Sequence, residues 1–233
     1  MKESDLICRM KRKWVKTTDS KHPFRRYPNL IKGMIVRRLS QVWLSDISYI
    51  RIHTGFVYLA AVLDACSRRV VGYAVSTNLD ALLTSEALRM AIGSRHSGCG
   101  TIHHFDQGVQ YASSEYVEEL TGYGFVISMA RSGNPYDNAP MESLFKTLKY
   151  EVNQCECEDF RDVVTRLPYF IEEIYNRKRL HSSLGSRPPD EYESLVLGQT
   201  HAKLPCQTFL TENVQPYGYT PWSSHRSPYS CRV

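Results

Sequence analysis

Three strongly apolar segments follow one another in the first third of this 233-residue chain, and they constrain the fold more than any other feature. The segments VWLSDISYIRI (42–52) and FVYLAAVLD (56–64) are separated by a short turn that contains Gly55, a pattern typical of a β-hairpin. The segment RRVVGYAVS (68–76) supplies a third strand. These runs are almost continuously apolar, as expected where both faces of a sheet are covered. The chain is therefore predicted to be an α/β protein.

Helical and strand patterns alternate after these strands. A helix is expected near residues 80–92, with Leu83 and Ala87 on its apolar stripe. The expected order continues with a strand at 101–105, a helix at 113–120, a strand at 125–129, a helix after Asn138, and a helix from Asp159 to Asn176 with a kink at Pro168. This order predicts a mixed five-stranded sheet with helices on both faces.

Three carboxylates occur in different contexts within this framework. Asp46 lies in the middle of the first strand, where an acid is disfavoured unless it is paired or bound to metal. Asp106 ends the fourth strand, and Glu142 lies on the helix after Asn138, with Lys146 and Lys149 four and seven residues further on. Acids that project from two strands and a nearby helix can hold two hard divalent cations. Such sites cut or join phosphodiesters.

Each acid also has a purely structural interpretation. Asp46 could face solvent at a strand edge or pair with Arg51. Asp64 is a rival, because it lies near Asp46 on the opposite strand, but its place before Ala-Cys-Ser favours turn capping. Asp106 could also cap a turn. The combination of the strand Asp, the strand-end Asp and Glu142 favours the metal site.

Neighbouring polar residues have open roles as well. Asn138 is expected to cap the helix that carries Glu142, and Asp137 is expected to belong to the preceding loop or to the cap. His103 and His104 flank the strand that ends in Asp106. They could neighbour a metal, but packing or partner roles are favoured.

The positive charge is concentrated outside the central strands. The chain carries a net charge of +5, and residues 1–41 contain twelve Lys or Arg against three acids. A second basic run, Arg177-Lys178-Arg179, follows the last expected helix. A neutral core between basic segments suits a polyanion clamped around a site. The alternatives are a solvated arm and a solvated helix end.

Other sequence features limit the location of the protein. No window approaches the roughly 18 apolar residues of a membrane span, and no secretory signal is evident at the N-terminus. The seven cysteines form no CxxC pair. They are interpreted as reduced thiols in the cytosol.

Five segments, in matching order and spacing, resemble insertion-sequence transposases of the two-reading-frame type, which have a retroviral-integrase-like DDE core. The segments are QVWLSDISYI, YLAAVLDACSRRVVGYAVS, HHFDQGVQY, SMARSGNPYDNAPMESLFKTLKYE and IYNRKRLHSSLGSRPPDEYE. The resemblance implies an RNase H-like fold and a core at about 42–195. It leaves 1–41 as a basic N-terminal arm, the remnant of a DNA-binding region, and 196–233 as an irregular tail.

The resemblance also implies the roles of individual residues. Asp46, Asp106 and Glu142 occupy the three catalytic positions, and we expect them to bind two Mg²⁺ or Mn²⁺ ions. Lys146 and Lys149 stand at the spacings of DNA-contacting lysines.

We further expect Tyr136 and Asn138 to contact DNA near the scissile phosphate, and Arg177, Lys178 and Arg179 to bind phosphates. The implied partners are transposon ends and target DNA, a second copy of the chain, and a separate upstream-frame product. The implied location is the bacterial cytoplasm, at the nucleoid.

Phe105 departs from the pattern, because this family usually has a small Ser before the second catalytic Asp. Its ring could hinder DNA entry or pack inward. The short N-terminal segment and the tail after residue 195 also depart from the family. Phe105 and the short N-terminal segment favour one alternative, a catalytically inactive DNA-binding remnant or regulator of transposition. A separate alternative is a nuclease on the same fold that cuts DNA without joining it.

Overall fold

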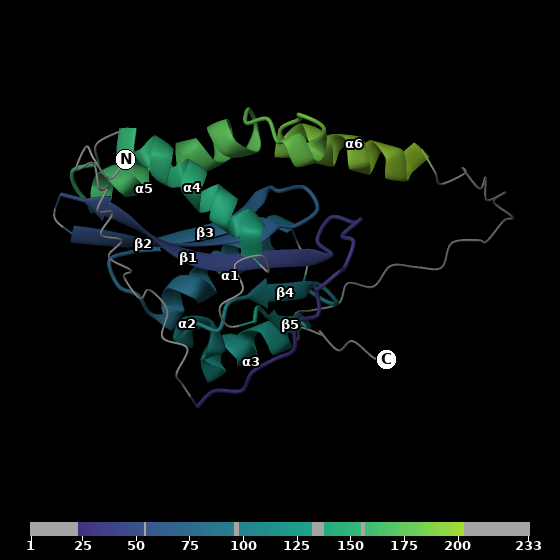
Figure 1. Cartoon of the computed structure of the whole chain (residues 1–233), viewed down its shortest axis with the longest axis horizontal. Coiled ribbons are helices and arrows are strands. Elements are labelled where there is room, and N and C mark those ends of the chain that lie inside the picture. The colour runs from purple at the N-terminus through teal and green to yellow at the C-terminus, as the bar shows by residue number, and fades with distance from the viewer. Residues whose placement is uncertain (1–22, 54, 96–97, 132–137, 155–156, 203–233) are drawn as a thin grey trace, which may run out of the picture.

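The computed structural model describes residues 23–53, 55–95, 98–131, 138–154 and 157–202, which build a five-stranded sheet and its helices (Figure 1). The strand order is β3-β2-β1-β4-β5. The strands are β1 (Val42–Ile52), β2 (Gly55–Asp64), β3 (Val70–Ser76), β4 (Ile102–Phe105) and β5 (Val126–Met129). The first three are antiparallel, whereas β4 and β5 run parallel to β1. The predicted mixed sheet is confirmed.

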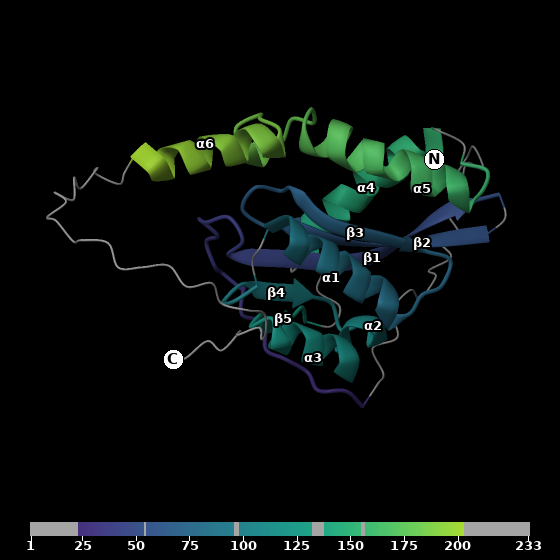
Figure 2. The same ribbon diagram turned by 180° about the vertical axis from the view of Figure 1, so that it is seen from behind.

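Helices cover both faces of this sheet (Figures 1 and 2). One face carries α1 (Ala81–Arg95), α2 (Val109–Ala112) and α3 (Ser114–Gly122). The other carries α4 (Ala139–Gln154), α5 (Phe160–Tyr169), the π-helix η2 (Phe170–Asn176), the 3₁₀ turn η3 (Ser182–Leu184) and α6 (Pro189–Ala202). No helix in these described segments is long and apolar enough to cross a membrane.

Strand β1 divides its side chains between two hydrophobic cores. Val42 and Leu44 are buried on the α4 side, and Trp43 is buried on the α1 side. The α4 stripe predicted from the sequence is buried in the first core; it consists of Met141, Leu144, Phe145 and Leu148. Because successive strand residues face opposite sides, Asp46 lies on the α4 side with Leu44.

The C-terminal helices differ from the expected pattern in two ways. Asp159 caps α5 by accepting the N–H of Asp162, but the α-helix ends at Tyr169, directly after Pro168, and a π-helix continues to Asn176. Proline has no N–H for the helical ladder, which explains a change of helix type here rather than a simple kink. Helix α6 continues to Ala202, so the expected boundary at residue 195 falls inside a helix.

The described part of the N-terminal arm lies against the core. The backbone N–H of Met129 in β5 donates to the carbonyl of Pro28 at 3.3 Å. The hydroxyl of Ser128 accepts the N–H of Leu30 at 2.9 Å. Since β5 is the outer strand, this segment covers an edge that would otherwise leave unpaired backbone groups.

Candidate active site

Asp46 and Asp106 are brought together by the register of two parallel strands. Leu44 of β1 pairs with His104 of β4, and this is the last pair between the two strands. Two residues further on, where the strands separate, Asp46 and Asp106 lie close enough for the charge of Asp106 to act on Asp46. Parallel partners face the same side of a sheet, so both carboxylates face α4.

The two carboxylates repel one another. Burial, and after it the charge of Asp106, raise the pKa of Asp46 from 3.8 to about 7. The N–H of Ile47, which donates to Oδ1 of Asp46 at 2.8 Å, and the charge of Lys149 oppose this rise. Because burial and mutual repulsion disfavour the charged forms of these half-buried acids, a bound cation would stabilise them, and the pair is suited to hold one.

Asp106 combines a turn role with this position. Its Oδ1 accepts the N–H of Gly108 at 2.9 Å. This contact confirms the capping interpretation without excluding the site interpretation, because the carboxylate also raises the pKa of Asp46. Asp106 is thereby held by the loop as well as by the strand.

Phe105 packs inward, away from the acids. Its side chain is fully buried and stacks on Tyr111, with ring centroids 5.1 Å apart. Tyr116 and His103 also contact it edge-on or tilted. Strand alternation explains the result, because residue 105 faces the side opposite to residue 106. Phe105 therefore does not fill the space in front of the two acids.

The histidines of β4 have packing roles. His103 Nε2 lies 2.8 Å from the hydroxyl of Tyr116 and 3.2 Å from Oγ of Ser45. Burial lowers the pKa of His103 to about 3, so the ring is neutral. His104 Nδ1 lies 2.8 Å from Oγ of Ser128. These bonds tie the two rings to neighbouring elements and confirm the packing interpretation.

Helix α4 begins beside β1, but Asn138 does not cap it. The side-chain amide of Asn138 donates to the carbonyl of Ser45 at 3.5 Å. Its Oδ1 is buried and accepts no hydrogen bond from the residues that the structure describes, so the expected cap is wrong. The contact instead ties the start of α4 to β1, at Ser45, the residue just before Asp46.

The polar flank of α4 faces this part of the sheet. The ammonium of Lys149 lies 4.1 Å from the ring centroid of Tyr49 and acts electrostatically on Asp46. Lys146 and Glu142 are exposed. Across the described ranges, no three His, Cys, Asp or Glu side chains form a group that could hold one metal ion. The two aspartates are therefore paired, and Glu142 stands apart from them on the first turn of α4.

The rival acid Asp64 is a turn residue. It pairs across the sheet with Trp43, whereas Asp46 pairs with Ala61. The carboxylate of Asp64 is buried and accepts the N–H groups of Ser40 and Cys66 at 2.7 and 2.8 Å. The predicted capping role is confirmed.

The other expected contact residues are scattered. Arg177 pairs with Glu173 at 2.6 Å, Lys178 is exposed, and Arg179 is half-buried. Tyr136 and Asp137 lie outside the described residues. Sequence reasoning missed Tyr49, whose partner Lys149 is 100 residues away along the chain; alternation alone could not reveal this pair.

Comparison with known proteins identifies the class. A family model described as "Integrase core domain" matches residues 37–135, and a second model with the same description matches residues 123–189. The fold resembles the catalytic core domain of BIV integrase (TM-score 0.50, 20% identity, 70% of this chain and 98% of that one). It also resembles a chain of the simian T-cell lymphotropic virus intasome in complex with PP2A regulatory subunit B56 gamma (TM-score 0.55, 18% identity, 88% and 67% covered). The fold is that of an RNase H-like integrase core.

Curated relatives place the chain more closely. It is 38% identical over 190 residues to the insertion element IS600 uncharacterized 31 kDa protein of Shigella sonnei, covering 81% of this chain and 70% of the relative. It is 40% identical over 168 residues to the transposase for insertion sequence element IS904 of Lactococcus lactis, covering 71% and 66%. The match to transposase InsF for insertion sequence IS3fB of Escherichia coli is 38% over 156 residues, covering 66% and 54%.

The chain belongs to the family of insertion-sequence transposases with an integrase core domain. It spans 66% of the length of the IS904 transposase and about half of the InsF transposase.

Proposed function

We propose that this chain is the catalytic core of a DNA transposase, which nicks the ends of a DNA element and joins them to a new strand. The observation that supports this proposal is the pair of half-buried carboxylates, Asp46 and Asp106, at the point where β1 and β4 separate. Its membership of the transposase family supplies the substrate class.

The two aspartates are the proposed metal ligands, and Glu142 is proposed to complete the set. The residues fit divalent cations, because their oxygens are hard ligands and the burial and mutual repulsion of the aspartates favour a bound positive charge. Bound Mg²⁺ or Mn²⁺, with two ions expected, supplies Lewis-acid activation of the attacking oxygen and stabilises the leaving oxygen.

The remaining residues orient the DNA. Lys149, held over Tyr49 beside Asp46, presents a cation for a phosphate next to the acids, and Lys146 adds another on the same flank of α4. Lys178 is exposed for a further phosphate contact. Tyr136 and Asn138 are proposed near the scissile phosphate.

Both chemical steps are in-line displacements at phosphorus. Water attacks first and frees a 3′-hydroxyl at the element end, and that hydroxyl then attacks the target strand while the target 3′-oxygen leaves. No covalent protein–DNA bond is required. We propose that the protein acts as a homo-oligomer on DNA in the bacterial cytoplasm, at the nucleoid, with a separate upstream-frame product assisting end recognition.

A strand-transfer assay tests the proposal. Labelled element-end oligonucleotides are incubated with the protein, target DNA and Mg²⁺ or Mn²⁺, and joined products are separated on a denaturing gel. Asp46→Asn and Glu142→Gln should abolish nicking and joining while DNA binding is retained. Joining that survives Asp46→Asn contradicts the assigned role.

The same assay separates the two alternatives. A nuclease would cut the labelled end but never join a supplied 3′-hydroxyl. An inactive remnant would do neither and would show no Asp46-dependent binding of divalent ions. The inward packing of Phe105 removes one of the sequence features that had favoured the remnant.

A further inference from the structure

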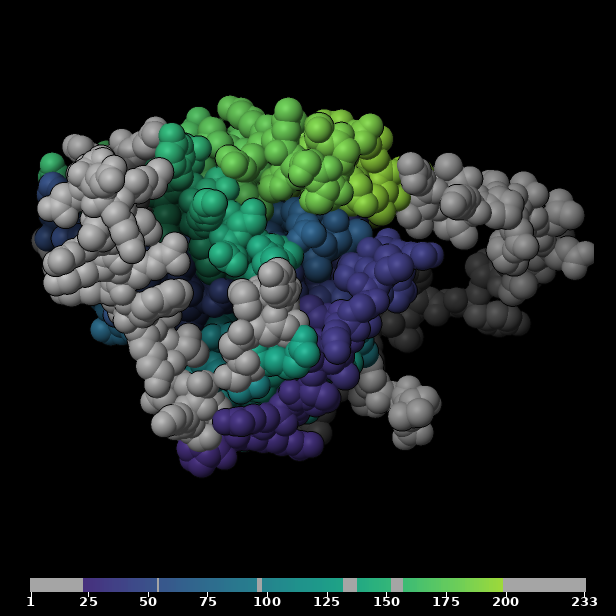
Figure 3. All heavy atoms as spheres, in the orientation of Figure 1, coloured from purple at the N-terminus to yellow at the C-terminus, as the bar shows by residue number. Residues whose placement is uncertain are grey.

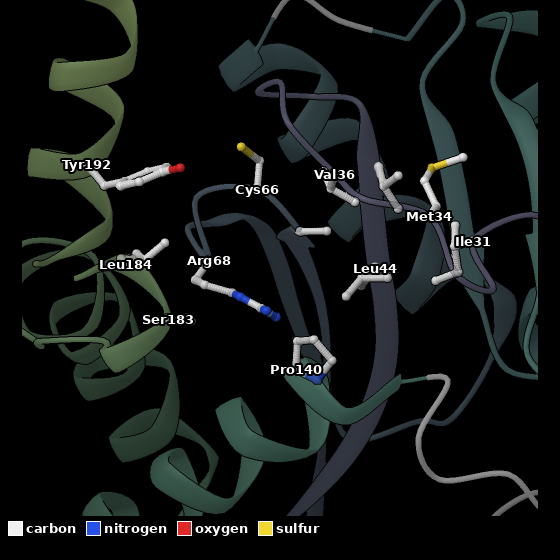
Figure 4. Close-up of a pocket in the computed structure, with 12 residues that line it drawn as sticks. Ile31, Met34, Val36, Leu44, Cys66, Arg68, Pro140, Ser183, Leu184 and Tyr192 are labelled. Atoms are coloured by element: carbon white, nitrogen blue, oxygen red, sulfur yellow. The ribbon is translucent and has the colours of Figure 1, made fainter. Parts of the chain in front are cut away.

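A cavity of about 390 Å³ lies between β1, the start of α4, the N-terminal segment and η3 (Figure 4). Leu44 of β1 and Pro140 of α4 form part of its wall, and each is two residues before a proposed metal ligand. The N-terminal segment contributes Met34, and the C-terminal turn η3 contributes Ser183. The volume is at the lower end of the range for small-molecule sites, roughly 300–1,000 Å³. It suits one nucleotide and is too small for a duplex.

Arg68 points its guanidinium into this cavity, between Leu44 and Pro140 (Figure 4). The next residue, Arg69, is paired with the carboxylates of Asp190 and Glu172. No carboxylate in the described segments pairs with Arg68, and burial lowers the pKa of its guanidinium. An arginine that is partly removed from water without an acid partner leaves strong donors available for an anion.

The backbone and the back wall support the same role. Arg68 has a left-handed backbone (φ 61°), which is unfavourable for a residue with a side chain and is often kept where a site needs it. Burial lowers the pKa of His181, and the charges of Arg179 and Arg68 act on it in the same direction, so both guanidinium groups lie near this ring. Arg68 and Arg179 are therefore the basic groups at this end of the cavity, whereas the acids Asp64 and Glu193 act on its Cys66 end.

The cavity is open to the surface. Figure 3 shows blue residues of the segment after β2 recessed between the purple N-terminal segment, the teal start of α4 and the green C-terminal helices. Ser183, at its rim, is exposed. A ligand could therefore enter from the face of the molecule seen in Figure 3.

We propose that this cavity binds one unpaired nucleotide of the DNA end, with the base against Leu44, Met34 and Pro140 and a phosphate on Arg68. The proposal rests on the proposed function, which supplies DNA as the ligand. Apolar walls accept the face of any base, and a guanidinium binds phosphate through two donors. Removing a terminal nucleotide from its partner strand would bring the neighbouring phosphodiester towards the acids, as enzymes that extrude a base do with their reacting atoms.

The test compares two DNA ends on the full chain. One fluorescent duplex is blunt, and the other has the same sequence with its last nucleotide unpaired. We expect the wild type to bind the unpaired end at least tenfold more tightly, and Arg68→Met to reduce that preference to within twofold. Arg161→Met, which removes an exposed charge on α5, is the matched control and should keep the preference.

A second pair of variants keeps the proposal testable if Arg68→Met fails to fold. Ser183→Trp should fill the cavity from its rim and abolish the preference, whereas Ser182→Trp, exposed on the same turn but not in the wall, should keep it. A wild type without preference, or a preference that survives both Arg68→Met and Ser183→Trp, overturns the proposal. So does an equal loss of blunt-duplex binding in Arg68→Met, which would make Arg68 a general DNA contact.

The binding test and the strand-transfer test of the proposed function can fail independently of each other. The preference is a binding ratio, and it should persist in Asp46→Asn. A protein that never joins DNA but keeps an Arg68-dependent preference retains this inference and rejects the proposed function. A protein that joins DNA with no such preference does the reverse.

Discussion

Replacing Asp46 with Asn should stabilise the metal-free protein while removing its response to divalent ions. The pKa of Asp46 is raised from 3.8 to about 7 by burial and by Asp106. At a pH above both pKa values, a shift of this size lowers the free energy of unfolding by about 4 kcal/mol. The neutral Asn can keep the hydrogen bond from Ile47, but its amide is also desolvated, so we expect about half of this amount, about 2 kcal/mol.

The pH dependence has a defined sign. Between pH 4 and 7 the folded protein holds a proton on Asp46 that the unfolded chain releases, so this residue makes stability fall as pH rises. The advantage of Asp46→Asn over the wild type should therefore be small at pH 4 and should develop mainly between pH 5 and 7.5. At pH 7.5 in EDTA it should correspond to a Tm higher by about 4–8 °C.

Thermal and urea denaturation at pH 5 and 7.5, each with EDTA or Mg²⁺, measures these effects. Mg²⁺ should raise the Tm of the wild type, because a ligand that binds only the folded state stabilises it, and it should leave Asp46→Asn unchanged. Glu118→Gln, an exposed change on α3, serves as the control and should follow the wild type. The reasoning is refuted if Asp46→Asn is less stable than the wild type in EDTA at pH 7.5.

Three further substitutions test side-chain contacts elsewhere in the core and beside the acids. Phe105→Ala should cost about 3–5 kcal/mol in urea denaturation, because it empties a buried aromatic cluster. Asn176→Ala should cost about 2–3 kcal/mol by the same measurement, since this side chain bonds both the N–H and the carbonyl of Val70 in the protein interior. Lys149→Met removes a charge that lowers the pKa of Asp46, so the pH at which Mg²⁺ begins to raise the Tm should move upward; an unchanged threshold would contradict that coupling.

The sheet and its two acids could be predicted from sequence because both depend on local pattern. The apolar runs set the strands, and a strand-interior acid is conspicuous in such a run. The pairing of Asp46 with Asp106 then follows from a short parallel register, Leu44 with His104, which places the next even-numbered residues together. The inward position of Phe105 follows from the same alternation and could have been decided from sequence.

Other parts of the site depend on contacts between distant segments. Asn138 has the sequence of a helix cap, but the carbonyl of Ser45, 93 residues earlier, takes its amide instead. Arg68 lies in a turn that resembles any polar turn, and its environment is defined by η3 and by the N-terminal segment. No local pattern in the chain predicts these neighbours.

The three proposed metal ligands are unequally fixed, and the fold explains why. Asp46 lies within β1 and accepts the N–H of Ile47, and Asp106 directly follows β4 and accepts the N–H of Gly108, so both are positioned by adjacent strands and local hydrogen bonds. Glu142 is on the first exposed turn of α4, whose start is tied to β1 through Asn138. We therefore propose that cation binding is the step that brings the two strand acids and Glu142 of α4 into one site. Weakening the tie with Asn138→Ala should therefore reduce the stabilisation by Mg²⁺ more than it reduces the stability of the protein in EDTA.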